Sequence, residues 1–240
     1  MTNRKSKTSI KSLLLSVIGI VTYPFINIFN SIKINDTNHL DNLPNRNVLF
    51  VSNHQTYFWD VITLYHIFSA HSWGKKKKLG FPYYLIRPYT EINYVAASKT
   101  MNSSFVAKLF ALAGAITVKR TWNNSSGESL SGLDVGDTRN ISRALENNWM
   151  ITFPQGTTSP YAPGRKGTGF IIKQNKPIVI PVVIKGFSNT FSKKGMGVKR
   201  INSKLEVTFK APLNIDYNSS SDEILHLVMD AIEQSEKFNI

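Results

Sequence analysis

Short apolar runs alternate with amphipathic segments along most of this 240-residue chain. Runs such as residues 48–53 and 91–98 stop at turn-forming residues, which is typical of buried strands. Segments such as residues 61–71 and 221–238 have the period of a helix with one apolar face. Strands that alternate with helices predict an α/β fold, with a mixed, largely parallel central sheet flanked by helices.

The length and composition favour one principal domain. Apolar residues make up 42% of the chain and charged residues 18%, which is typical of a globular protein. We expect residues 36–240 to form the domain and residues 1–35 to form an N-terminal membrane-associating helical segment, with residues 34–47 as linker and loop. The chain has no cysteine, which excludes disulfides, thiolate metal sites and a cysteine nucleophile.

The N-terminal segment joins a basic start to a long apolar run. Residues 1–11 hold four cations and no acid, and residues 12–32 hold no charge. A helix of this length crosses a hydrocarbon core of ~30 Å. Pro24 is expected to kink or split the helix, so two short helices in the membrane interface are an equal alternative. The basic flanks favour attachment to the cytoplasmic face of the inner (plasma) membrane.

Two other interpretations of this segment stay open at this point. A secretory signal also has a basic start and an apolar middle, but no small-residue cleavage site follows the run. A core helix buried in the domain is the second alternative. Membrane association is the favoured interpretation of the three.

The formal net charge of +14 predicts a polyanionic partner, although a general bias toward lysine accounts for part of it. A nucleic acid is disfavoured as the partner because the chain has no arginine-rich run. A protein that binds nucleic acid would also not need the apolar N-terminal segment. An anionic membrane or a phosphorylated substrate fits better. Lys75–Lys78 form a basic loop. We favour a solvated loop as its interpretation over a patch that binds a membrane or a carrier protein.

His54 and Asp60 are the first candidates for chemistry. They follow a predicted strand in the stretch VSNHQTYFWD, with five residues between them. Six positions on an ideal helix turn through ~600°, so a straight helix does not bring the two side chains together. They meet only if His54 lies in a turn and Asp60 lies near the start of the next helix. Asp60 would then orient the imidazole as a general base. Taken alone, the stretch favours a turn histidine and a helix cap.

Three later segments change this interpretation. Each lies where a predicted strand gives way to a loop, the edge of an α/β sheet where ligands bind. Their sequences are GAITVKR at residues 114–120, FPQGTTS at residues 153–159 and IVIPVVI at residues 178–184. Together with the His54 segment, and in this order, they resemble the glycerophosphate and lysophospholipid acyltransferase family. Its hallmarks are an NH-x4-D motif, a G-x5-R segment, an FPEGTRS loop and a late V-P-[VI] strand.

The resemblance implies a reaction and roles for named residues. The family transfers an acyl group from acyl-carrier protein or coenzyme A to a lipid hydroxyl, without an acyl-enzyme. The family's base corresponds to His54 and its carboxylate to Asp60. Arg120 is expected to hold the acceptor's phosphate, because a guanidinium clasps phosphate through two hydrogen bonds. Gly156 and Thr157 match the Gly-Thr of the loop and are expected to line the acceptor site.

Further expectations complete the site. Lys119, Gln155 and Arg165 join the residues expected to bind substrate. No metal and no bound cofactor are expected, and the acyl-carrier protein or coenzyme A thioester acts as a co-substrate. Membrane lipids, including a lyso-lipid acceptor, are the expected partners, and nucleic acid is not.

The chain departs from the family pattern at three places. The first spacing is x5 rather than x4, Gln155 stands where the family has Glu, and Thr158 stands where it has Arg. The last change removes a cation from the presumed phosphate site, which Arg165 and Lys166 are placed to replace. These departures leave open a different lyso-lipid acceptor, such as an amino-acid lipid, and a non-catalytic lipid-binding relative of the family.

Overall fold

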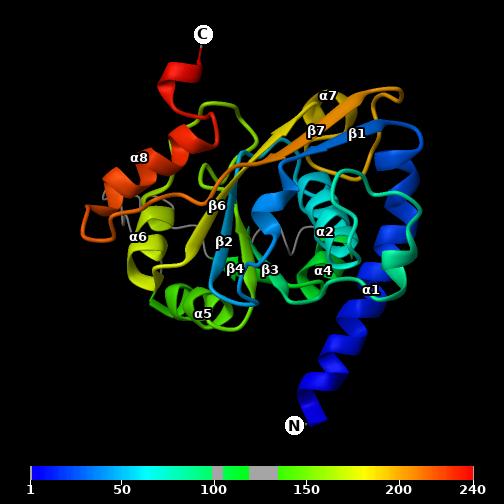
Figure 1. The fold of residues 1–240 in the computed structure, drawn as a ribbon, viewed down its shortest axis with the longest axis horizontal. Coiled ribbons are helices and arrows are strands. Elements are labelled where there is room, and N and C mark those ends of the chain that lie inside the picture. The colour runs from blue at the N-terminus through cyan, green and yellow to red at the C-terminus, as the bar shows by residue number, and fades with distance from the viewer. Residues whose placement is uncertain (1, 99–104, 119–134, 240) are drawn as a thin grey trace.

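The computed structural model describes residues 2–98, 105–118 and 135–239. In these residues a single sheet is covered by helices on both faces (Figure 1). The strands are β1 (Ser31–Asn35), β2 (Val48–Ser52), β3 (Ile92–Ala97), β4 (Ala115–Val118), β5 (Trp149–Thr152), β6 (Ile178–Lys185) and β7 (Lys204–Phe209). The helices are α1 (Thr2–Asn27), α2 (Trp59–Ser72), α4 (Phe105–Leu112), α5 (Val135–Leu145), α6 (Lys166–Asn175), α7 (Phe187–Thr190) and α8 (Ser221–Ala231). Short 3-10 helices are η1 (Thr37–Leu40), η2 (Tyr83–Ile86) and η3 (Glu236–Phe238).

The seven strands follow the order β1-β7-β6-β2-β5-β3-β4. Neighbouring strands pair in parallel except β6 and β7, which pair antiparallel. The predicted mixed, largely parallel sheet flanked by helices is therefore confirmed. The antiparallel pair reverses the direction of β7 and β1, so the five strands from β6 to β4 all end at one edge of the sheet.

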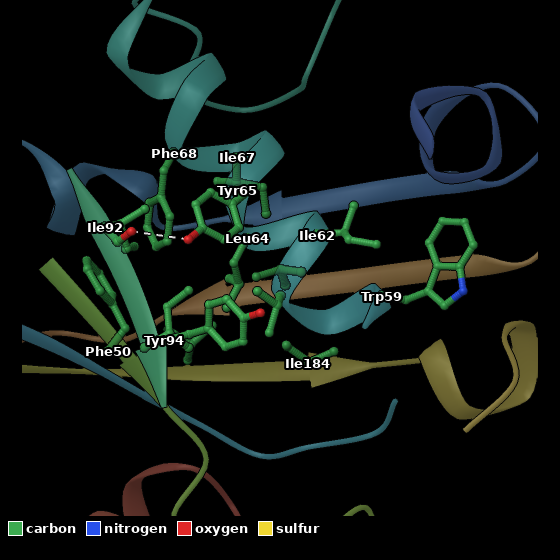
Figure 2. Packing of buried hydrophobic residues seen from close by; sticks show 14 of the residues in the cluster. Phe50, Trp59, Ile62, Leu64, Tyr65, Ile67, Phe68, Ile92, Tyr94 and Ile184 are labelled. Atoms are coloured by element: carbon green, nitrogen blue, oxygen red, sulfur yellow. Dashed lines mark hydrogen bonds between the residues drawn. The ribbon is translucent and has the colours of Figure 1, made fainter. Parts of the chain in front are cut away.

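Alternating side chains of β2 supply two hydrophobic cores. Val48 and Phe50 pack with α1, α2 and α4 on one face of the sheet. Leu49 and Val51 pack with α5, α6 and α8 on the other face. A strand buried on both faces explains why the run is apolar at every position. Figure 2 shows the first core around α2, where the Tyr65 hydroxyl donates to the Ile92 carbonyl at 3.1 Å.

The structure decides between the two arrangements that the sequence left open for the N-terminal helix. α1 is continuous and includes Pro24 in its last turn, so one helix forms rather than two short ones. Proline has no N–H to donate to the Ile20 carbonyl, so the helix lacks one hydrogen bond there, and α1 ends three residues later. Residues Ile10–Asn27 are long and apolar enough to cross a membrane by length and composition.

The segment after α1 is more ordered than the predicted linker. β1 pairs in parallel with β7 and occupies the end of residues 1–35, which were expected to be helical. η1 lies within residues 34–47, which were expected to form only linker and loop. An edge strand of five residues with mixed burial carries little periodic signal in the sequence. The predicted division of the chain between residues 35 and 36 stays a prediction. β1 lies on the N-terminal side of this boundary and is part of the sheet.

Candidate functional site

His54 and Asp60 are hydrogen-bonded to each other. His54 lies in the loop after β2, and Asp60 is the second residue of α2. Nδ1 of His54 lies 2.9 Å from Oδ2 of Asp60, and the Asp60 side chain is fully buried. The loop turns back on itself before the helix begins. The longer spacing therefore still brings the two side chains together, in the only arrangement that the sequence allowed.

Asp60 also receives hydrogen bonds from the loop that it closes. The backbone N–H groups of Gln55 and Thr56 donate to Oδ2 at 2.6 and 3.0 Å. The Thr56 hydroxyl donates to Oδ1 at 2.6 Å. A carboxylate that accepts three such donors is held in one orientation. It accepts the Nδ1 proton of His54, which leaves Nε2 with its lone pair as the basic atom.

The residues on either side of His54 tie the loop to the next strand and helix. The Asn53 side-chain amide exchanges two hydrogen bonds with the Ile184 backbone, both 2.8 Å long. Oε1 of Gln55 accepts the backbone N–H groups of Phe187 and Ser188 at 2.8 and 3.2 Å. These bonds link the loop after β2 to β6 and α7. The histidine therefore sits on a loop that is fixed at both sides.

Two cavities meet at His54. The first is mainly apolar, and its lining includes Tyr57, Phe153, Gly156 and Arg165. The His54 ring stacks on the Phe153 ring there, with centroids 4.0 Å apart. The second is more polar than the first, and its lining includes Gln55, Lys185, Ser188, Lys193 and Gln234. Among the described residues, His54 is the only one that lines both cavities.

Charged groups border the polar cavity. Glu233 forms ion pairs with Lys185 at 2.9 Å and with Lys210 at 3.0 Å. Burial raises the pKa of Glu233, but the hydrogen bonds and charges of the two lysines outweigh this effect and hold the pKa below its usual value. Glu233 is therefore ionised at neutral pH and fixes the chain after α8 to the ends of β6 and β7.

Gly156 and Arg165 lie together at the apolar cavity. Gly156 has a φ of +61°, and a Cβ atom at this position would lie 2.3 Å from Nε of Arg165. Nε of Arg165 donates to the Gln155 carbonyl at 3.2 Å, so the side chain folds over the glycine. Glycine is required here both for the backbone conformation and for this close approach. Of the two cations considered as replacements for the family arginine, Arg165 lines the cavity. Lys166 instead pairs with Asp222 at 3.3 Å.

The other two loop residues make contacts within the protein. The Gln155 side chain is buried, and its Nε2 lies within 3.4 Å of three acceptors on Ser159, Ala162 and Gln234. The structure thus gives Gln155 a role in holding the loop. Thr157 accepts the Ser159 N–H at 3.3 Å in a local turn and lines neither of the two cavities. Direct contact of either residue with substrate stays a prediction.

Two predicted site residues lie outside the residues that the structure describes, and two residues of the site were not predicted from the sequence. Lys119 and Arg120 fall outside the described residues, so their predicted role stays a prediction. Sequence reasoning missed Thr56 and Phe153. Thr56 bonds to Asp60 across the loop and is not the N-cap of α2, which is Phe58, so no capping pattern points to it. The contact of Phe153 with His54 joins the ends of β5 and β2, which are neighbours in the sheet but far apart in the sequence, so it has no local signal.

Comparisons with known proteins bear on the family and on the fold. The sequence profile of the family described as "Acyltransferase" matches residues 33–185. Among solved structures, the chain is similar to the 1-acyl-sn-glycerophosphate (LPA) acyltransferase PlsC from Thermotoga maritima. The TM-score is 0.56 at 17% sequence identity, over 92% of this chain and 76% of that one, a likeness of fold. No curated protein sequence matches the chain. Because the matched profile spans more than half of the chain, the protein belongs to the acyltransferase family.

Proposed function

We propose that the protein transfers a fatty acyl group from an acyl thioester to a hydroxyl of a lyso-lipid, in membrane lipid biosynthesis. One observation carries the proposal: a histidine bonded to a buried carboxylate stands where an apolar and a polar cavity meet. Among the described residues, no group of the protein hydrogen-bonds Nε2 of His54. His54 lines both cavities, where a substrate hydroxyl would meet it.

The chemistry follows from the orientation of the imidazole. Nε2 of His54 takes the proton of the acceptor hydroxyl as its oxygen attacks the thioester carbonyl carbon. The tetrahedral intermediate collapses, the C–S bond breaks, and the imidazolium returns the proton to the departing thiolate. Asp60 stabilises the imidazolium between these steps. The hydroxyl attacks the thioester directly, so no acyl-enzyme forms.

The apolar cavity offers groups for two parts of such substrates. The apolar cavity takes a fatty acyl chain beside Tyr57 and Phe153. Arg165, which folds over Gly156 at the same cavity, supplies a cation for an anionic acceptor group. Lys119 and Arg120 are also expected to contribute positive charge to the acceptor site. The donor is an acyl thioester of either acyl-carrier protein or coenzyme A, and no bound cofactor takes part.

Attachment to a membrane is part of the proposal. One face of α1 packs on the domain through Leu15, Thr22 and Ile26, which are almost fully buried. The opposite face exposes Leu13 and Val17. A helix with these two faces lies in the interface more readily than it spans the bilayer. The basic residues of the N-terminus favour the anionic cytoplasmic face.

The test is acyl transfer from labelled thioester donors to a panel of lyso-lipids, in mixed micelles. The wild type is expected to form a diacyl product, and His54→Ala is expected to lose at least 100-fold of kcat. Lyso-lipid affinity, measured separately by calorimetry, is expected to change little. Equal turnover by both proteins would remove His54 from the mechanism. Binding without turnover by the wild type would instead support a non-catalytic lipid-binding role.

A further inference from the structure

The loop between α2 and β3 exposes large apolar side chains. In and beside η2, the exposed fractions are 65% for Phe81, 56% for Tyr83 and 71% for Ile86. Trp73, at the start of the same loop, is also exposed. Exposed aromatic residues placed together are uncommon on a soluble surface and mark a contact with a partner or a membrane. We refer to residues 73–87 as the η2 loop.

The η2 loop is fixed to α1. The hydroxyl of Ser16 donates to the Leu85 carbonyl at 2.6 Å, and the hydroxyl of Tyr23 donates to the Gly80 carbonyl. Gly19 permits the closest approach, because a Cβ atom there would overlap the Leu85 side chain. The η2 loop and α1 therefore present one rigid surface.

A hydrogen-bonded histidine reinforces this junction. Ring nitrogens of His66 on α2 lie 3.0 Å from the Thr22 hydroxyl of α1 and 3.0 Å from the Tyr84 hydroxyl of η2. All three side chains are buried. The position of η2 relative to α1 is thus set by the core and not only by surface contacts.

The exposed side chains of the η2 loop border the apolar stripe of α1. Successive helical residues are about 100° apart, which places the exposed residues of α1 on one stripe about 100° wide. These residues are Ile10, Leu13, Val17, Ile20 and Val21. Ser16, Gly19 and Tyr23, which contact the η2 loop, fall on the helical face next to this stripe. The apolar surface therefore continues from α1 onto η2.

Cations accompany this apolar surface. Lys76, Lys77, Lys78 and Arg87 of the η2 loop are exposed. Lys76 pairs with Asp41 at 2.6 Å. The side chains of Lys77 and Lys78 have no acidic partner among the described residues. Lysines beside exposed aromatic residues suit the headgroup region of an anionic bilayer, where aromatic rings and cations are both stable.

We propose that the η2 loop is a second membrane-docking element, which inserts Phe81, Tyr83 and Ile86 into the headgroup region of an anionic bilayer beside α1. The inference rests on the membrane attachment proposed for α1 and adds a site to it. Lys77 and Lys78 bind the anionic lipid headgroups. The basic run is thus a membrane patch, not the solvated loop that the sequence favoured. With contacts at both α1 and the η2 loop, the domain has one orientation on the bilayer.

The absence of cysteine makes the test direct. Three single-cysteine variants, Tyr83→Cys, Val17→Cys and Leu227→Cys, carry an environment-sensitive nitrobenzoxadiazole dye on η2, α1 and α8. Leu227 is exposed on α8, at the opposite side of the domain from α1 (Figure 1). With vesicles of phosphatidylglycerol and phosphatidylcholine, the dyes at positions 83 and 17 are expected to shift to the blue, and the dye at position 227 is not.

The three labels separate the possible failures. A shift at position 17 without one at position 83 would overturn the η2 site while α1 attachment stands. No shift at either position would overturn the η2 site together with the proposed membrane attachment. Equal shifts at all three positions would overturn it as well, because binding would then have no preferred orientation. The acyl-transfer assay in micelles reports on the proposed reaction independently of these outcomes.

A charge-reversal pair tests the lysines. Lys77→Glu/Lys78→Glu is expected to bind anionic vesicles at least roughly 30-fold more weakly and to bind neutral vesicles as the wild type does. The control Arg139→Glu/Arg143→Glu makes the same change of net charge on exposed positions of α5, on the other face of the sheet. Its binding is expected to change much less. Equal losses in the two variants would overturn a specific role for Lys77 and Lys78.

Discussion

Nδ1 of His54 lies 2.9 Å from Oδ2 of Asp60, although five residues separate them. The loop accommodates the longer spacing because the N–H groups of Gln55 and Thr56 converge on the same carboxylate oxygen. The carboxylate therefore organises the turn and the imidazole at once. A change at Asp60 must affect both the loop and the chemistry.

Asp60→Asn is expected to lower kcat by about 100- to 10,000-fold, because the amide no longer selects the productive tautomer of His54. Steady-state acyl transfer measures this effect, and circular dichroism checks the fold. Asp222→Asn, at an exposed acid of α8, is the matched control and should retain wild-type activity. A kcat for Asp60→Asn within about twofold of the wild type would contradict the pairing.

Thr56→Ala removes the hydroxyl that donates to Oδ1 of Asp60 at 2.6 Å. It leaves that oxygen without this donor in a buried site, so the free energy of unfolding should fall by about 1–3 kcal/mol. We expect kcat to fall by about tenfold, which corresponds to about 1.4 kcal/mol of lost positioning. Thr56→Ser keeps the hydroxyl and should restore both quantities. If serine fails to restore kcat, the hydroxyl is not the cause.

Gly156→Ala combines backbone strain with a collision. The φ of +61° costs alanine about 1–2 kcal/mol, and the new Cβ atom displaces Arg165. Gly74 has a φ of +77° and nothing within 4 Å of an added Cβ, so Gly74→Ala carries the strain alone. Both variants should lose stability in chemical denaturation. Only Gly156→Ala should raise the KM for the acceptor, and equal KM values would argue against a role for Arg165.

Arg165→Ala is expected to lower kcat/KM for an anionic lyso-lipid by about 10- to 100-fold, the value of a charged hydrogen bond. Lys166→Ala removes the neighbouring cation, which pairs with Asp222 away from the cavity, and should have little effect. Arg165→Lys should recover activity only in part, because it keeps the charge and loses the planar fork. An unchanged kcat/KM for Arg165→Ala would mean that the acceptor's charge is bound elsewhere.

His66 predicts a loss of stability in mild acid. Burial lowers its pKa from 6.5 to about 3, so the folded protein keeps the imidazole neutral while the unfolded chain takes up a proton below pH 6.5. The free energy of unfolding should therefore fall from pH 6.5 toward pH 3, by up to about 1.4 kcal/mol per pH unit. His66→Gln should flatten this slope in urea titrations, while His226→Gln, at an exposed position, should not. Parallel slopes for the wild type and His66→Gln would contradict the assignment.

The sequence by itself determined the alternation of strands and helices and the ordered set of motifs. β2 and α2 lie close to their predicted positions because local periodicity encodes them. The same motifs identified the family that the profile later matched. β1 was not predicted, and the sequence left open whether α1 continues through Pro24. β1 depends on pairing with β7, which lies far along the chain, and no local pattern reports such a contact.

Only the tertiary structure decided how the site is assembled. It showed that His54 and Asp60 meet, because the loop hydrogen bonds that close their turn depend on backbone geometry. It also distinguished Arg165, which folds over Gly156 at the cavity, from its neighbour Lys166, which points to α8. Two adjacent cations are equivalent in a sequence, and the direction of each side chain is set by the residues that pack around it.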